Sequence, residues 1–369
     1  MTSGQIEIIA IAVLTASACA LVGVFLVLRR MSLVSDAITH SVLLGIVLAF
    51  FVTQSTTSPL LLVAAALTGV LTVALVELVT RTRLVKEDEA IGLVFPVLFS
   101  IGVILVSRYA GGVHLDIDTV LLGELALAPF DRVEVAGYDL GPAALVTMAG
   151  VLAIDAVIVL LLWKELKLTA FDSALALSLG LAPTAVTYGL MTLVSLTAVG
   201  AFNAVGSILA VALMIAPPAA AYLLSDTLWR VTVLAVAIGA ACGVAGYWAA
   251  YFLDASIAGC IAGACGVAFA LAWAFAPGRG LVASARRRAR QRVDFALAML
   301  AIHLANHEGK PEAIEESRRD HLGRHLHWDA ARVDEIVSSA ERRGLVVESG
   351  GVLALTDSGR SLARETVTF

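Results

Sequence analysis

An aspartate and a histidine lie four residues apart in an apolar stretch near the start of the chain. The stretch MSLVSDAITHSVLLGIVLAFF spans residues 31–51 and contains Asp36 and His40. Residues four apart in a helix project from the same face, so the two side chains should lie together. Ionisable residues are costly inside a membrane helix and usually serve a function there.

A metal path is the chemistry that these residues favour. Glu77 lies in the apolar stretch 59–80 and adds a second carboxylate. Carboxylate oxygens with one imidazole suit Mn²⁺, Fe²⁺ or Zn²⁺, and an incomplete ligand shell would release its ion readily. The alternative is structural: Asp36 follows Arg30 by six residues, so Asp36 and His40 could lie near the membrane surface and pair locally.

A second group of residues of types that can bind a metal lies in the polar stretch 111–141, which contains HLDIDTVLLGELALAPF. The stretch is too short and too polar to span a membrane, so we expect a surface or re-entrant helix. His114, Asp116 and Asp118 could collect a cation at the outer mouth of a path. A polar outer loop explains the same residues without a metal.

The composition is that of a polytopic membrane protein. Of 369 residues, 59% are hydrophobic and 15% are charged, whereas soluble domains have about 45–50% apolar and about 25% charged residues. The four cysteines lie in apolar stretches without a CxxC pair, so we expect neither disulfides nor a thiolate metal site. Residues 1–5 lack Lys and Arg, so we expect a retained first helix rather than a cleaved signal.

Nine stretches are long and apolar enough to span a membrane. They are 6–28, 34–53, 59–80, 90–108, 142–163, 184–202, 204–224, 230–252 and 256–276. Eight spans are the alternative. Basic clusters follow every second stretch, so the positive-inside rule places the N-terminus outside and the C-terminal region in the cytoplasm.

The stretch 168–183 reads LTAFDSALALSLGLAP, as in a short amphipathic helix followed by a Gly/Pro turn. It follows a basic pair and lies on the inner side, where a cytoplasmic partner could dock; a plain loop is the alternative. No GxxxxGK[ST] loop occurs, so a separate subunit must hydrolyse ATP if transport is powered. No nucleophile–base arrangement favours an enzyme.

A soluble domain follows the membrane part. We divide the chain into a membrane domain (1–280), a basic linker (281–292) and a cytoplasmic domain (293–369). The last should contain helices at 293–309, 312–326 and 329–344, followed by a strand, a Gly-Gly turn, a strand and a short helix. The fold class is therefore an all-α polytopic membrane bundle followed by a small α+β winged-helix domain.

In the third helix of this domain, Asp329 should be the N-cap and Gly344 the stop. From residue 293 onward there are nine Lys and Arg against thirteen Asp and Glu, so DNA binding is not expected. The basic run 286–292 fits an anionic lipid surface better.

The cytoplasmic domain also carries histidines with metal-ligand spacing. Each of two pairs has members four residues apart: His303 with His307, and His321 with His325. Such spacing can bind a regulatory metal. Exposed or capping histidines are the alternative.

Five stretches together resemble the permease subunit of manganese/zinc/iron-type ABC transporters. They are MSLVSDAITHSVLLGIVLAFF, EDEAIGLVFPVLFSIGVILVSR, LDIDTVLLGEL, FDSALALSLGL and VGSILAVALMIAPPAAAYLLSD, in the family's order over about 30–226. The stretch SLTAVGAFNAVGSILAVALMIAPPAAAYLLSD, residues 195–226, looks closest to the manganese branch. The run ERRGLVVESGGVLALTDSGRSLA is similar to the wing of iron- and manganese-dependent repressors. A tail of this kind departs from many members of the permease family.

The resemblance implies that Asp36 and His40 coordinate the passing metal, and that FDSALALSLGL is the segment that contacts the ATPase. The coupling residues would be Phe171, Asp172, Ala176, Leu179 and Gly180. It also implies a bacterial cytoplasmic membrane, two ATP-binding subunits, a second permease and an extracellular metal-binding protein. The cargo would be Mn²⁺, or Fe²⁺ or Zn²⁺, with no permanent cofactor.

The leading hypothesis is therefore a metal importer that works by alternating access. Two alternatives are kept. One is a permease for a larger metal chelate, which would need a wider pore and no metal ligands. The other is a membrane-tethered regulator that acts through the winged helix, which would need a strongly basic recognition helix.

Overall fold

The computed structural model describes residues 2–54, 59–109, 125–135 and 138–367. The chain forms two compact units, Met1–Gly280 and Leu281–Phe369. Each unit has its own apolar core.

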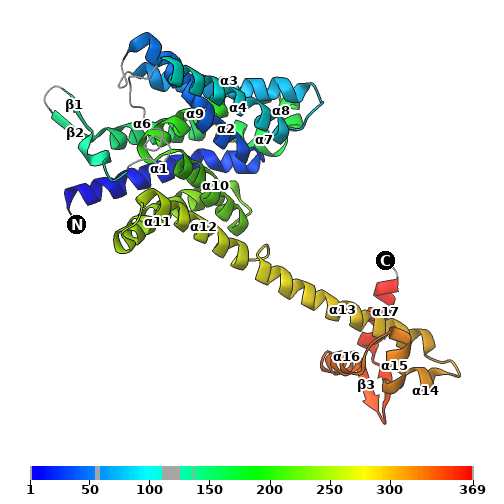
Figure 1. The fold of residues 1–369 in the computed structure, drawn as a ribbon. Coiled ribbons are helices and arrows are strands. Elements are labelled where there is room, and N and C mark those ends of the chain that lie inside the picture. The colour runs from blue at the N-terminus through cyan, green and yellow to red at the C-terminus, as the bar shows by residue number, and fades with distance from the viewer. Residues whose placement is uncertain (1, 55–58, 110–124, 136–137, 368–369) are drawn as a thin grey trace. The chain divides into compact units, whose positions relative to one another are not determined.

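Within the described part of the chain, nine helices of the first unit are long and apolar enough to cross a membrane (Figure 1). This agrees with the nine stretches expected from the sequence. The helices are α1 (Ser3–Leu28), α2 (Ser32–Thr53), α3 (Pro59–Arg81), α4 (Glu87–Tyr109), α6 (Ala143–Leu161), α9 (Pro183–Val205), α10 (Ser207–Leu224), α11 (Leu228–Leu253) and α12 (Ile257–Phe275). Two short helices, α7 (Trp163–Phe171) and α8 (Ser173–Ser178), connect α6 to α9.

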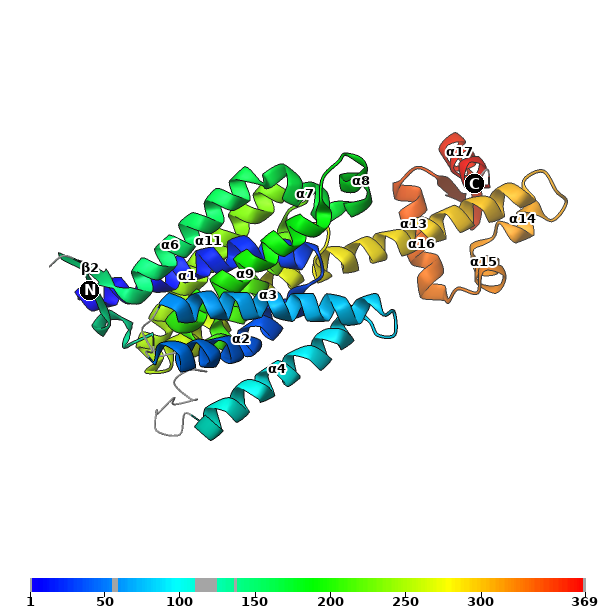
Figure 2. The same cartoon turned by 90° about the horizontal axis from the view of Figure 1, so that it is seen from above.

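Helix α1 lies in the middle of the bundle, against α6, α9, α10 and α11 (Figure 2). Its neighbours approach closely because residues without bulky side chains lie at the contacts. A Cβ on Gly23 of α1 would overlap the Met214 carbonyl of α10, and one on Gly69 of α3 would overlap the Ser195 hydroxyl of α9. Such close contacts favour association of helices in lipid, where burial of apolar side chains provides little driving force.

Buried hydroxyl groups also join helices of the bundle. Thr72 of α3 donates a hydrogen bond to Ser41 Oγ of α2 at 2.7 Å. Ser195 of α9 donates to the Ala66 carbonyl of α3 at 3.0 Å. Helices α2, α3 and α9 are therefore fixed by polar contacts as well as by packing.

The helix expected in 111–141 falls largely on residues 111–124, which lie outside the described residues, so it stays a prediction; residues 125–135 and 138–142 form other elements. They form a 3-10 turn, η1 (Ala128–Phe130), and an antiparallel hairpin of β1 (Arg132–Val135) and β2 (Tyr138–Pro142). The Arg132 guanidinium pairs with Asp139 across the hairpin at 2.7 Å and with Glu7 of α1 at 3.2 Å. These ion pairs anchor the hairpin to the start of α1.

The described residues of the second unit, 281–367, form five helices and one two-stranded antiparallel sheet. The elements are α13 (Leu281–His307), α14 (Ala313–Glu316), α15 (Arg319–Leu326), α16 (Ala330–Arg342), β3 (Val346–Ser349), β4 (Val352–Leu355) and α17 (Asp357–Val367). The basic stretch 281–292, expected as a linker, forms the first turns of α13.

Where one helix was expected over 312–326, the chain forms α14 and α15 with an extended residue between them. The Ser317 carbonyl accepts a hydrogen bond from the Leu353 amide at 2.9 Å, and the Arg319 amide donates to the Gly351 carbonyl at 3.1 Å. Arg318 itself forms an isolated bridge with Val352. This pairing with the hairpin breaks the helix, because the backbone groups involved are no longer available for helical bonds.

Other expectations for this unit are confirmed. Asp329 caps α16, since its side chain accepts a hydrogen bond from the Arg332 amide at 2.7 Å. Gly344 ends the helix region with a φ of 65°. Gly350 and Gly351, with φ values of 62° and 80°, form the turn between β3 and β4, because glycine adopts positive φ without strain.

The substitution Gly23→Val should destabilise the bundle, because the added side chain collides with the backbone of α10. Overpacking of this kind costs about 1–3 kcal/mol. We expect a lower thermal midpoint and a smaller monodisperse fraction for the variant in detergent. Gly150→Ala is the matched control, since a Cβ there meets nothing within 4 Å. Equal stability of Gly23→Val and Gly150→Ala would contradict the packing.

Candidate functional site

Asp36 and His40 lie side by side on α2, as their spacing predicts. His40 Nε2 is 3.4 Å from Asp36 Oδ1. The imidazole stacks on Phe95 and meets the edge of Phe99, with ring centroids 6.0 and 5.8 Å apart. Both phenylalanines belong to α4, so a second helix fixes the ring. The carboxylate is the more open of the two, at 44% exposed against 31% for the imidazole.

Glu77 has other partners. Arg81 binds its carboxylate with Nη2 at 2.6 Å and Nε at 3.1 Å, one helical turn away on α3. The Tyr188 hydroxyl of α9 donates to its other oxygen. Within the described ranges, Glu77 does not join Asp36 and His40 in a group of three ligand atoms within 4.8 Å.

The expected outer-mouth ligands His114, Asp116 and Asp118 lie outside the described residues.

Asp155 of α6 is a candidate that the sequence reasoning missed. Its side chain is completely buried in the bundle, and the Thr197 hydroxyl of α9 donates to Oδ2 at 2.7 Å. Its Oδ1 has no hydrogen-bond partner among the residues that the structure describes. A lone acidic residue in the apolar run VLAIDAVIVL was the available signal, because ionisable groups in spans are rarely incidental.

The segment expected to couple to a partner forms the short helix α8. Asp172 caps it, accepting a hydrogen bond from the Leu175 amide at 2.9 Å. Ala176 is fully buried and anchors the helix to the bundle. Gly180 has a φ of 82°, a conformation that favours glycine, and turns the chain toward α9.

An exposed apolar surface surrounds this anchor. Phe171, Leu177 and Leu179 are 64%, 66% and 61% exposed. They come from the end of α7, from α8 and from the residue after it. Three large exposed apolar side chains therefore lie on and directly beside the short capped helix α8, and exposed apolar patches often mark a protein contact.

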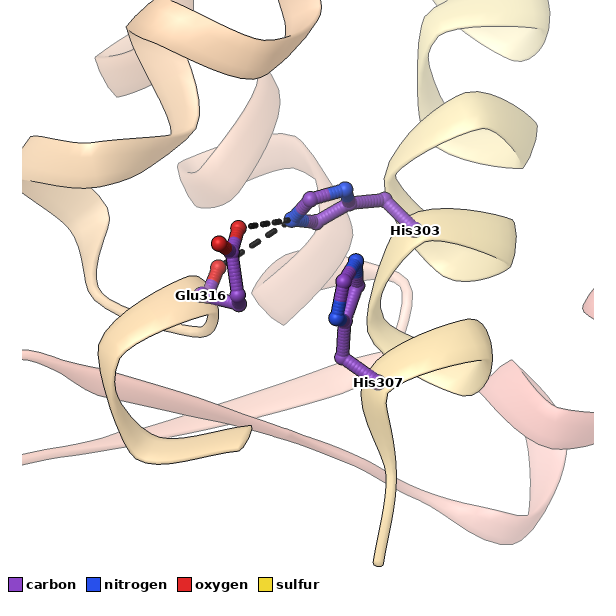
Figure 3. Close-up of side chains that lie close together, drawn as sticks. All are labelled: His303, His307 and Glu316. Carbon is purple, nitrogen blue, oxygen red and sulfur yellow. Dashed lines mark hydrogen bonds and ion pairs between the residues drawn. The ribbon is translucent and has the colours of Figure 1, made fainter. Parts of the chain in front are cut away.

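The four expected histidines of the second unit come together around Glu316, which the sequence reasoning did not identify. His303, His307 and Glu316 form one group of three ligand atoms, and Glu316, His321 and His325 form another. Figure 3 shows the first group. Burial holds the pKa of His303 below its ordinary value, which favours the neutral imidazole that binds metals.

Comparison with known proteins identifies the family of the chain. Residues 5–276 match the model of the ABC 3 transport family. The chain is 48% identical over 358 residues to the zinc transport system membrane protein TroD of Treponema pallidum, covering 97% of each. It is 46% identical over 275 residues to the manganese transport system membrane protein MntD of Bacillus subtilis, covering 74% of this chain and 93% of MntD.

A solved structure shares the architecture. PsaBC from Streptococcus pneumoniae in complex with Fab aligns with a TM-score of 0.63 and 26% identity, covering 76% of this chain and 94% of the other. The TroD alignment is longer than the first unit and includes most of the second. The chain belongs to the ABC 3 transport family.

Proposed function

We propose that this chain is the membrane permease subunit of an ABC importer for a divalent transition metal, with Mn²⁺ the favoured cargo. The observation that carries the proposal is the Asp36–His40 pair on a helix of the bundle, with ligand atoms 3.4 Å apart. Similar proteins are named for zinc and manganese transport. ATP hydrolysis belongs to a separate subunit of such systems.

Asp36 and His40 provide one carboxylate oxygen and one imidazole nitrogen. An ion bound between them keeps most of its coordination positions for water or for ligands from a second permease. A shell that is mostly oxygen favours Mn²⁺, whereas a richer nitrogen shell would favour Zn²⁺. Phe95 and Phe99 restrict the imidazole, so the ring can bind and release the ion without reorienting.

Coupling to ATP would take place at α8. The exposed side chains of Phe171, Leu177 and Leu179 supply apolar contact area for an ATP-binding subunit. Ala176 ties α8 to the bundle, and Gly180 leads directly to α9. Movement of α8 would thus reach α9, which contacts α1, α2 and α3. We therefore propose alternating access in which the ATPase drives these helices.

The assembly we propose contains two permeases, two ATP-binding subunits and an extracellular metal-binding protein. The PsaBC likeness supports pairing of permeases. We place the N-terminus outside the cytoplasmic membrane and the second unit inside, because Lys and Arg are concentrated in the loops that would then be cytoplasmic.

We propose further that the second unit is a winged helix in which α16 precedes the β3–β4 wing. Its arginines favour a role other than DNA binding. Arg319 pairs with Asp334 and Glu348, Arg343 with Asp294, and Arg360 with Glu308. Cations held by carboxylates are poor phosphate ligands, so a metal-responsive repressor is the weaker alternative. A chelate permease is also weaker, since it would not need the Asp36–His40 pair.

Replacement of a proposed ligand should abolish metal uptake. We expect His40→Ala to lower ⁵⁴Mn uptake by at least tenfold in cells that contain the partner subunits, because removing even an outer-shell partner of a metal ligand costs about 10–100-fold. His327→Ala is the control, as an exposed histidine of the second unit. Parallel competition with Zn²⁺ and Fe²⁺ tests selectivity. Unchanged uptake by His40→Ala would remove this residue from the path.

Replacement of Leu177 by Glu should uncouple the ATPase, because it puts an unpaired charge into an apolar contact. A loss of about 2 kcal/mol in the free energy of binding corresponds to roughly thirtyfold weaker association of the permease with the ATP-binding subunit. Co-purification of the ATP-binding subunit measures it. Val347→Glu, at a similarly exposed position on β3, is the control. Retention of the ATPase by Leu177→Glu would show that α8 is not its docking site.

A further inference from the structure

Two pairs of histidines in the second unit face one glutamate. His303 and His307 lie one turn apart on α13, and His321 and His325 lie one turn apart on α15. Residues at this spacing share a helix face. Glu316, the last residue of α14, contributes to both groups of ligand atoms. Three separate helices therefore supply one cluster, which we call the Glu316 cluster.

Each carboxylate oxygen of Glu316 has at least one imidazole nitrogen nearby. Oε2 is 3.4 Å from His325 Nε2 and 3.8 Å from His303 Nε2, and Oε1 is 3.6 Å from His321 Nε2. Figure 3 shows Glu316 facing His303 and His307. These separations from the carboxylate exceed the 2.7–3.2 Å of an ordinary N–H···O bond, whereas the backbone carbonyl oxygen of Glu316 lies 3.1 Å from His303 Nε2, within hydrogen-bond distance.

The separations fit ligands around an ion. Two ligand atoms that each lie about 2.1 Å from a tetrahedral metal are about 3.4 Å apart. Within the described part of the chain, Glu316 Oε2 and His307 Nδ1 are buried without a hydrogen-bond partner. A buried carboxylate oxygen without a donor is unfavourable, and a bound cation removes that cost.

Ion pairing alone does not account for the arrangement. The side chains of His303, His321 and Glu316 are only 10%, 17% and 15% exposed. Imidazolium ions that surrounded a single carboxylate would repel one another in this poorly solvated space. Neutral imidazoles with a central carboxylate are, in contrast, a common ligand set for a divalent metal.

We propose that the Glu316 cluster is a divalent transition-metal site in which Glu316 is the ligand shared by the two histidine pairs. Its imidazole-rich composition favours Zn²⁺, Co²⁺ or Ni²⁺ over Mn²⁺. The bound metal ties α13 to α14 and α15, and so rigidifies the second unit. This site is separate from the proposed transport path and does not depend on the transport function.

The test uses the full chain in lipid nanodiscs, without a polyhistidine tag and with Asp36→Ala and His40→Ala, so that the proposed path cannot contribute. Co²⁺ is titrated and followed by its visible absorption, and is then displaced with Zn²⁺. We expect one or two ions per chain and at least a tenfold loss of affinity in Glu316→Gln. Glu315→Gln and His327→Ala, both exposed and outside the cluster, should bind normally.

Hydrogen exchange of the same samples shows which segments the bound metal stabilises. Zn²⁺ should slow amide exchange in 313–326, where α14 and α15 lie, and should not do so in Glu316→Gln. His321→Gln is a second variant, and unchanged exchange in α16 of each metal-free variant verifies its fold. Absence of bound Co²⁺, or equal affinity in Glu316→Gln and the intact cluster, would overturn the proposal.

Discussion

Direct contact between helix backbones is the interaction on which the membrane unit depends. Apolar side chains gain little by leaving lipid for a helix interface, so close packing must hold the bundle together. Gly23 lets α1 touch α10, and Gly69 lets α3 touch α9. At these short distances the hydroxyls of Thr72 and Ser195 reach partners on neighbouring helices. Phe95 of α4 likewise packs against His40 of α2, with ring centroids 6.0 Å apart.

Features decided by local sequence were predictable. Span positions follow from composition over about 20 residues, and the cap at Asp329 follows from the residues directly beside it. The break at Ser317 was not predictable in this way, because its partner Leu353 lies far along the chain. The hairpin after Phe130 was missed for a related reason, since its anchor is Glu7 at the start of α1.

The same distinction applies to the candidate sites. The contact of Asp36 with His40 follows from the spacing within one helix. The shared position of Glu316 requires three helices to meet, so the histidine spacing alone could not identify it. Asp155 differs, because a lone carboxylate in an apolar run was visible in the sequence. Its burial and the hydrogen bond from Thr197 could be learned only from the packing of α6 against α9.

The backbone bond between Ser317 and Leu353 has a mechanical consequence. Ser317 directly follows Glu316, so the hairpin and the carboxylate are joined by one peptide unit and one short hydrogen bond. A molecule that bound the turn at Gly350 and Gly351 would therefore act, through these backbone hydrogen bonds, on the segment that follows Glu316. Conversely, an ion in the proposed site would bind a residue whose chain neighbour is hydrogen-bonded to β4, so metal binding and the position of the hairpin would be coupled.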